Sequence, residues 1–106
     1  MEDSQHMEQL LVDGLGHLHI KEIYEYYDGP RLFCAENLTG QKYLVIWVEA
    51  GDEWDRWFFV PISHERLLEI KSQKISLRVA ISHPEDGFIW EVHAWFDGRP
   101  WEATIL

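Results

Sequence analysis

Cysteine is almost absent from this 106-residue chain, since Cys34 is the only one. A single cysteine excludes an internal disulfide and any zinc site built from several thiolates. The chain also lacks a basic, apolar leader at its N-terminus, and it has no apolar run near the roughly 18 residues that a membrane span requires. These absences predict a cytoplasmic protein without a membrane partner.

Lysine and arginine are scarce as well: there are 9 of them against 19 aspartates and glutamates, which gives a net charge of −10. Binding to DNA or RNA normally needs a stripe of basic side chains that displaces counterions from the phosphates. The densest basic stretch, residues 66–78, follows Glu65 and contains Glu69. We therefore expect no direct binding to nucleic acids. The acidic surface either suits a basic protein partner or only keeps the chain dispersed in water.

The motifs of common catalytic and cofactor sites are missing too. The sequence holds no phosphate-binding P-loop, no G-x-S-x-G nucleophile motif and no complete glycine-rich dinucleotide turn. Cys34 falls inside an expected strand, where a lone cysteine usually acts as a small buried apolar residue. The paired carboxylates at residues 52–55 and 85–86 fall in expected turns, where acids are normally solvated. We expect neither an enzyme nor a bound cofactor, with a metal- or small-molecule-binding enzyme as the alternative.

Six histidines raise the question of a metal site. His17 and His19 would share one face of a strand, and His93 lies on a second strand. No recognised metal-binding spacing such as H-E-x-x-H occurs. Scattered surface histidines are the simpler interpretation, so no metal is predicted, and these three histidines are the candidates if one is bound.

Aromatic side chains, in contrast, are abundant: they make up 14% of the residues and include six tryptophans. A chain of this length forms one domain with a single core. Each buried Trp or Tyr would contribute on the order of 150–250 Å² of surface to that core. Trp47, Trp57 and Trp90 fall on expected strands and are predicted core residues.

From residue 20 onward the sequence alternates between strands and tight turns. Strands are predicted for six segments, namely residues 20–27, 31–36, 42–49, 56–62, 87–96 and, at an edge, 101–106. Asp28-Gly29-Pro30 is a strong turn signal, because Gly tolerates positive φ and Pro fixes its own φ. Residues 42–49 are apolar on both faces, which is typical of a central strand that is covered on two sides.

Two segments between the fourth and fifth strands carry helical signals. Ser63 and Ser76 are the N-cap residues of helices predicted over residues 63–72 and 76–82. The predicted fold is therefore α+β: an antiparallel meander sheet of five to six strands, with one or two short helices inserted between strands four and five. It forms a single domain over residues 20–106.

Residues 1–19 are predicted to form an N-terminal arm outside this domain. Residues 7–12 have the composition of a short helix, which Gly14 and Gly16 would end. The first five residues are polar and are expected to fray.

A series of turn residues and core aromatics runs through residues 20–93. Its members are Tyr27-Asp28-Gly29-Pro30, Phe33, Gly40-Gln41, Tyr43-Leu44, Trp47, Val60-Pro61-Ile62-Ser63, Arg66-Leu67, Ile75-Ser76-Leu77-Arg78, Pro84-Glu85-Asp86-Gly87 and Trp90-Glu91-Val92. Their order resembles a family of small uncharacterised bacterial domains. The resemblance implies the same kind of fold and a bacterial cytosolic setting, and it implies no catalytic residues.

Three further tryptophans are expected at the periphery of the sheet: Trp54 in an acidic loop, Trp95 at a strand end and Trp101 just after a turn. Aromatic side chains at such places are typical anchors of protein interfaces. The alternative is that they close the open ends of a small sheet. Together with the acids of the loop they give the predicted partner-binding set, which is Trp54, Asp52, Glu53, Asp55, Trp95 and Trp101.

These features favour a non-enzymatic protein-interaction module, such as an accessory, antitoxin-like or immunity-like protein of a bacterial system. An acidic rim would speed association with a basic partner and make it dependent on salt. A second hypothesis is an acidic nucleic-acid mimic that inhibits a DNA- or RNA-binding protein, and the third is the enzyme considered above. A homodimer is a further expectation, because an open meander has two exposed edges that can pair across a two-fold axis.

Overall fold

The computed structural model describes residues 9–26 and 29–106, which form seven strands and two short helices. The strands are β1 (Gln9–Asp13), β2 (Gly16–Tyr26), β3 (Pro30–Asn37), β4 (Lys42–Glu49), β5 (Trp54–Ile62), β6 (Trp90–Trp95) and β7 (Trp101–Ile105). The helices, α1 (His64–Lys71) and α2 (Leu77–Ser82), lie between β5 and β6. Neither of them, in this described part of the chain, is long and apolar enough to cross a membrane.

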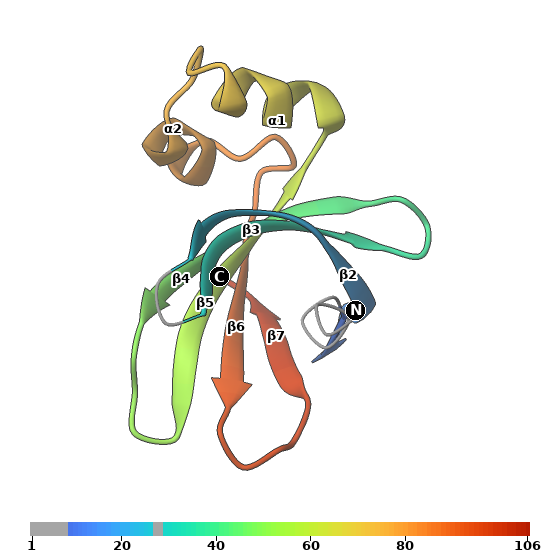
Figure 1. Cartoon of the computed structure of the whole chain (residues 1–106), viewed down its shortest axis with the longest axis vertical. Coiled ribbons are helices and arrows are strands. Elements are labelled where there is room, and N and C mark those ends of the chain that lie inside the picture. The colour runs from blue at the N-terminus through green and yellow to red at the C-terminus, as the bar shows by residue number, and fades with distance from the viewer. Residues whose placement is uncertain (1–8, 27–28) are drawn as a thin grey trace.

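The seven strands close into a barrel in their sequence order (Figure 1). Each strand pairs antiparallel with the next one along the chain, and β7 pairs with β1 in the parallel direction. The prediction of an open antiparallel meander of five to six strands is therefore wrong. The reason is a non-local pairing: β1, from the predicted N-terminal arm, adds a strand beside β2 and also pairs with β7, which closes the sheet.

The short helix predicted over residues 7–12 is wrong wherever the structure describes it, because β1 takes its place. Side chains along β1 alternate between the barrel interior and solvent: Val12 is fully buried, whereas Leu11 is 47% exposed. Such alternation is the pattern of an amphipathic strand. Residues 9–19 therefore belong to the barrel, and the rest of the predicted arm, residues 1–8, lies outside the described residues.

Both helices lie where the sequence predicts them, and each begins at its expected N-cap serine. The Ser63 Oγ accepts a hydrogen bond from the Arg66 N–H, and the Ser76 Oγ accepts one from the Val79 N–H, both at 3.1 Å. Glu85 reinforces the first cap, because its carboxylate accepts hydrogen bonds from the N–H and the hydroxyl of Ser63 at 2.8 and 2.7 Å. The segment after α2 is thereby tied back to the start of α1.

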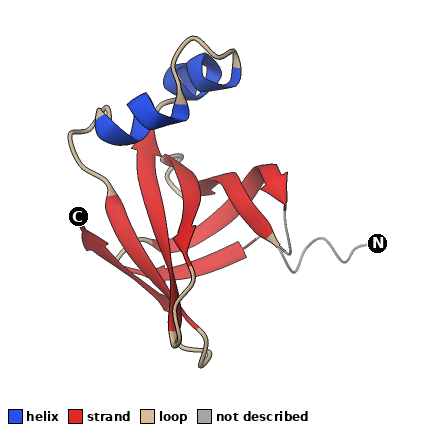
Figure 2. Cartoon of the chain, turned by 90° about the vertical axis from the view of Figure 1, so that its left-hand side faces the viewer, coloured by secondary structure: helices blue, strands red, loops and turns tan. Residues whose placement is uncertain are grey.

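The sheet separates two hydrophobic cores, and both helices lie on the same side of the barrel (Figure 2). The interior of the barrel is filled by Val12, Leu18, Phe33, Ala35, Tyr43, Val45, Trp57, Phe59, Val92 and Ala94. Outside the barrel, the helices pack on β3, β4 and β5 through a cluster of Cys34, Leu44, Val60, Ile62, Leu67 and Ile89. β4 contributes to both cores, with Val45 facing inward and Leu44 facing the helices. The prediction that this strand is covered on both sides is confirmed.

The pairing of β1 with β7, which we call the seam, is narrow. It joins Val12 to Trp101 and the following residue of each strand. Gly14, directly after β1, has a φ of +100°, and a Cβ at this position would lie 3.4 Å from the Ala103 carbonyl oxygen. Glycine is the residue that adopts this conformation without strain. The barrel is thus closed by two residue pairs and a turn that lies close to β7.

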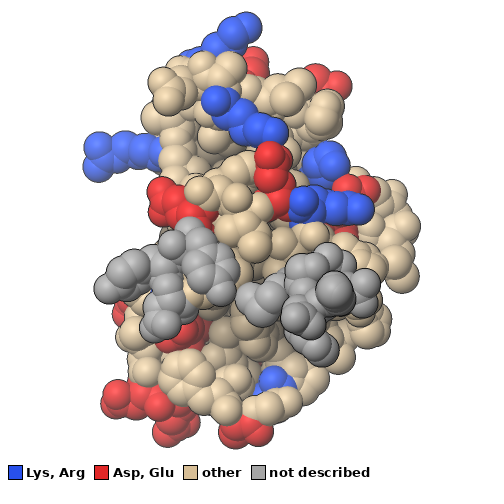
Figure 3. All heavy atoms as spheres, in the orientation of Figure 1, with Lys and Arg blue, Asp and Glu red and all other residues tan. Residues whose placement is uncertain are grey.

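Basic side chains are concentrated at one end of the molecule (Figure 3). On the face shown, most Lys and Arg side chains lie on the helices or just below them, whereas Asp and Glu side chains are spread over the whole face and include a group at the lower-left tip. Figure 1 shows that the loop between β4 and β5, which contains Asp52 and Glu53, turns at this tip.

Candidate functional site

The pairing of β5 with β6 divides the predicted partner-binding residues into two groups, because neighbouring residues along a strand point to opposite faces of a sheet. Trp54 pairs with Trp95 on the outer face, whereas Asp55 pairs with Ala94, a buried residue of the barrel core. Trp101 also packs against the core inside the barrel. The structure thus brings Trp54 and Trp95 together outside the barrel, and it places Asp55 and Trp101 on the inner side.

Four residues on the outer face, which are Trp54, His93, Trp95 and Arg99, form what we call the outer aromatic cluster. Trp54 and His93 stack almost in parallel, with 3.7 Å between their ring centroids and an interplanar angle of 12°. Trp95 stands edge-on to both rings, at 6.1 Å from Trp54 and 6.2 Å from His93. The Arg99 guanidinium lies 4.1 Å from the centroid of the Trp95 ring, in the range of a cation–π contact. All three rings are half-buried.

Ion pairs hold two edges of this cluster. In the turn after β6, Arg99 Nη2 donates to Asp97 Oδ2 at 2.6 Å, and this hydrogen bond keeps the pKa of the Asp97 carboxyl below its ordinary value. On the strands, Glu91 Oε2 accepts a hydrogen bond from Arg56 Nε at 2.8 Å and lies 3.3 Å from His93 Nε2. The rings are therefore held in one arrangement by their neighbours, which pre-organises the surface.

The acidic loop runs beside the outer aromatic cluster. Asp52 and Glu53 are exposed in it, and the Phe96 N–H donates to the Glu53 carbonyl at 3.0 Å, which ties the loop to the end of β6. The Phe96 side chain is 58% exposed. A depression of about 380 Å³ lies here, lined by Glu53, Trp95, Phe96 and Asp97. Neither Phe96 nor Arg99 is in the predicted set: Phe96 is the last residue of the expected strand 87–96, and Arg99 lies in the expected turn after it, where no periodic signal marks a side chain.

The inward-facing half of the predicted set lies at one mouth of the barrel. A cavity of about 320 Å³ opens there, lined mainly by apolar side chains, with Asp55 and Arg31 as its charged members. Trp57 and Trp101 stack in its wall, with centroids 5.6 Å apart at 26°, and Phe33 meets Trp57 edge-on at 5.7 Å. Trp101 is therefore part of a cavity wall rather than of the outer surface.

The three histidines considered as metal ligands lie on different elements. His17 and His19 belong to β2, whereas His93 stacks on Trp54. Over residues 9–26 and 29–106, no three His, Cys, Asp or Glu side chains form a group that could hold a metal ion. The role that the structure gives His93 is that of an aromatic neighbour. The sequence signal for it is the period-two alternation that puts His93 and Trp95 on one face.

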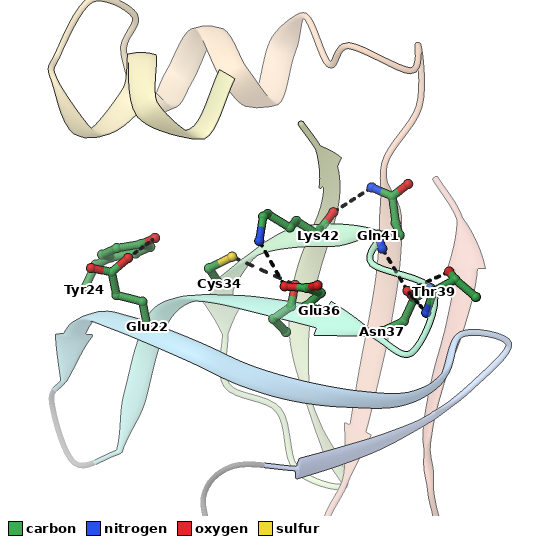
Figure 4. Close-up of polar contacts among 9 residues, drawn as sticks. Glu22, Tyr24, Cys34, Glu36, Asn37, Thr39, Gln41 and Lys42 are labelled. Carbon is green, nitrogen blue, oxygen red and sulfur yellow. Dashed lines mark hydrogen bonds and ion pairs between the residues drawn. The ribbon is translucent and has the colours of Figure 1, made fainter. Parts of the chain in front are cut away.

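Polar side chains of β2, β3 and β4 form a belt of contacts on the side toward the helices (Figure 4). Glu22 accepts hydrogen bonds from Lys71 Nζ of α1 at 3.0 Å and from the Tyr24 hydroxyl at 3.1 Å, and these bonds hold the pKa of Glu22 below its ordinary value. Lys42 Nζ donates to Glu36 at 2.9 Å and lowers the pKa of Glu36 in the same way. These contacts connect β2 to α1 and β3 to β4.

Cys34 lies behind this belt and is 2% exposed, packed with Leu44 and Leu67 under the helices. Burial raises the pKa of the Cys34 thiol. Because the thiolate is the nucleophilic form, a buried thiol of raised pKa is unreactive. The interpretation of Cys34 as a small buried apolar residue is confirmed.

Comparison with known proteins identifies a family and nothing further. A family model described as "Family of unknown function (DUF6575)" matches residues 8–101. Neither a curated protein nor a solved structure matches the chain. The function therefore has to be argued from the surfaces of the barrel.

Proposed function

The chain belongs to DUF6575, a family of unknown function, and from its surface we propose that it acts as a non-enzymatic protein-interaction module. Its contact surface is the outer aromatic cluster together with the acidic loop and Phe96. The observation that carries the proposal is the stack of Trp54 on His93 with Trp95 edge-on, held in place by ion pairs and surrounded by exposed carboxylates.

Protein interfaces gain most of their affinity from a few large side chains near their centre, and Trp and Arg are the most enriched of these. The outer aromatic cluster supplies two tryptophans and an arginine, and Phe96 adds an apolar ring that is 58% exposed. Since neighbouring contacts already fix the rings, binding would cost little further side-chain entropy.

The rim of this surface indicates the charge of the partner. Asp52 and Glu53 are exposed on the loop, and the whole chain carries a net charge of −10. A basic partner would be attracted to this end of the molecule, with an association rate that falls as salt is added.

The alternative of a nucleic-acid mimic has less support, because it needs a row of free carboxylates that imitates phosphates. Five of the 15 Asp and Glu residues in the described part of the chain are instead engaged by Lys or Arg side chains. The pairs are Glu22 with Lys71, Glu36 with Lys42, Glu49 and Glu91 with Arg56, and Asp97 with Arg99.

The test compares capture of a partner from source cells by three forms of the chain: the wild type, the double variant Trp54→Ala/Trp95→Ala, and Leu38→Ala. Leu38 is the matched control, because it is 78% exposed but lies in the β3–β4 turn. The partner is then purified and its affinity for each form is measured. We expect Leu38→Ala to bind like the wild type and the double variant to bind at least about 100-fold more weakly, since interface hot spots each contribute about 2 kcal/mol or more. Equal affinity for all three forms would refute the proposal, provided that circular dichroism shows each one folded.

We also propose that the system is bacterial and cytosolic and that the partner belongs to an accessory, antitoxin-like or immunity-like pair. The support is the order of turn and core residues from Asp28-Gly29-Pro30 to Trp90-Glu91-Val92 and the acidic charge of the chain. The genes beside this one test it: a neighbouring toxin or nuclease gene would support an inhibitory role.

A further inference from the structure

The cavity at the barrel mouth is separate from the outer aromatic cluster. The cavity lies on the inner face of the sheet, whereas the cluster lies on the outer face of β5 and β6. Its apolar walls are formed by Leu10, Ile20, Pro30, Phe33, Trp57 and Trp101. Its volume of about 320 Å³ falls at the lower end of the roughly 300–1,000 Å³ found for small-molecule sites. A ligand of this cavity would therefore be compact and largely apolar.

Asp55 is the acidic member of the cavity lining, which also includes Arg31. The side chain is half-buried in the lining, and its carboxylate makes no hydrogen bond or ion pair with any residue that the structure describes. A carboxylate on an apolar wall is costly unless a cation or a hydrogen-bond donor approaches it. The ligand that best compensates this group carries a positive charge.

Trp57 adds a second polar group that the described residues leave unsatisfied. The residue is 6% exposed, and its indole N–H is buried without an acceptor among them. The indole N–H groups of Trp47 and Trp95 are likewise buried without an acceptor among the described residues, so this donor does not distinguish the cavity. The half-buried Asp55 carboxylate is the group that indicates a binding site here.

Arg31, the basic residue of the lining, lies against one indole ring. The Arg31 guanidinium carbon lies 4.6 Å from the centroid of the Trp47 ring, and Arg31 itself lines the cavity. Indole faces attract cations through their quadrupole, most strongly where water is excluded. The net charge of −10 adds a long-range attraction for cationic ligands.

We propose that the barrel mouth binds a small organic amine in its ammonium form. The ammonium group is bound by the Asp55 carboxylate, and the apolar body of the ligand packs against Trp57, Trp101 and Phe33. This site is distinct from the protein-binding surface proposed above and would be occupied whether or not a partner is bound there.

Benzylamine is the probe, and benzyl alcohol is its neutral counterpart of nearly the same shape. Each is titrated into the ¹⁵N-labelled 106-residue chain while the indole N–H signals are followed by NMR. We expect benzylamine to shift the Trp57 and Trp101 signals in a saturable way. Benzyl alcohol should bind at least about tenfold more weakly, because a hydrogen bond between charged groups contributes about 1.5–3 kcal/mol and tenfold corresponds to about 1.4 kcal/mol.

Substitutions of two nearby acids, Asp55 at the start of β5 and Asp52 in the loop before it, separate the site from general charge attraction. Asp55→Asn should lower the benzylamine affinity at least about tenfold and leave the affinity for benzyl alcohol unchanged. Asp52→Asn removes the same charge from an exposed position and should change neither. If Asp55→Asn does not fold, Trp101→Leu replaces it, with the loss of benzylamine binding as the expected result.

Equal affinity for the amine and the alcohol would overturn the proposal, as would shifts confined to Trp54 and Trp95 or equal effects of the two Asp→Asn substitutions. The Trp54→Ala/Trp95→Ala variant should bind benzylamine like the wild type. A failure of this site can therefore be distinguished from a failure of the outer surface.

Discussion

Gly51 is the residue at which the acidic loop turns back toward β5. A side chain at this position would collide with the backbone carbonyl of Trp54. Backbone atoms cannot rotate out of the way as the end of a flexible side chain can, so the loop has to move to accept any larger residue. The position of Trp54 in the outer aromatic cluster thus depends on a residue three positions earlier that touches neither ring.

Gly51→Ala should therefore destabilise the protein by about 1–3 kcal/mol, the range of substitutions that force local backbone strain. The measurement is the free energy of unfolding in urea, together with the NMR shifts of the Trp54 and Trp95 indole N–H groups, which should both move. Asp52→Ala is the control from the same loop, and it should change stability by no more than about 0.5 kcal/mol. Equal stability of the glycine and alanine forms would show that the loop adapts without strain.

At the scale of single residues, the sequence predicted one set of site residues, and the structure divides that set between two faces of the sheet. Trp54, Asp55 and Trp101 were grouped because they lie near turns, yet Trp54 points outward while Asp55 and Trp101 line the barrel mouth. Alternation along one strand does separate Trp54 from Asp55. Which side of β5 becomes the interior, however, is decided by barrel closure, and closure depends on strands at the two ends of the chain.

Helix α1 is held to the barrel by its buried face, which can be tested with two adjacent leucines. Leu67 is 6% exposed and packs in the core between helices and sheet, whereas Leu68 is 47% exposed. Leu67→Ala should cost about 2–4 kcal/mol, since removing a buried leucine leaves a cavity. Leu68→Ala should cost less than about 1 kcal/mol. Urea unfolding of both variants checks this, and similar losses for the two would mean that α1 packs differently.

Ion pairs between elements make the stability depend on pH. Hydrogen bonds to Lys71, Lys42 and Arg99 lower the pKa values of Glu22, Glu36 and Asp97 below their ordinary values. A carboxyl group with a lowered pKa in the folded state stabilises the protein above its unfolded-state pKa, and this contribution is lost as the pH falls through the folded-state pKa. Stability should therefore be constant near neutral pH and decline below about pH 4.5, the ordinary value for glutamate.

Melting temperatures measured between about pH 7 and about pH 3 test this expectation. Glu36→Gln removes one of the three groups, so its melting temperature should fall less steeply in acid than that of the wild type. Lys42→Met removes the partner and should flatten the curve in the same sense. Identical slopes for the wild type and both variants would show that this pair does not contribute.

At the scale of elements, local signals were sufficient for some parts of the fold and insufficient for others. The N-caps Ser63 and Ser76 and the two-sided apolar pattern of β4 report local geometry, and the structure confirms them. Residues 9–13 have a composition that suits either a helix or a strand. Pairing with β2 and β7 selects the strand, and this long-range contact leaves no trace in a short window of sequence.

For the molecule as a whole, closure of the barrel removes the free sheet edges on which the expected homodimer depends. That expectation needed two free sheet edges, and in the closed barrel β1 covers them by pairing with both β2 and β7. Because the seam contains only two residue pairs, a small change there should expose two edges again. The intact chain is then expected to be monomeric, and a variant with an open seam should self-associate through its exposed strands.

Val12→Asp and Leu11→Asp test this with the same charge change at adjacent positions of β1. Val12 is fully buried at the seam, whereas Leu11 is 47% exposed. An unpaired charge in the core is strongly unfavourable, so Val12→Asp should detach β1 from β7 and give dimers or larger species in light scattering. Leu11→Asp should stay monomeric like the wild type, because its added charge remains in water. A wild-type dimer would show that association does not require an open edge, and a monomeric, stably folded Val12→Asp chain would show that the barrel does not depend on its seam.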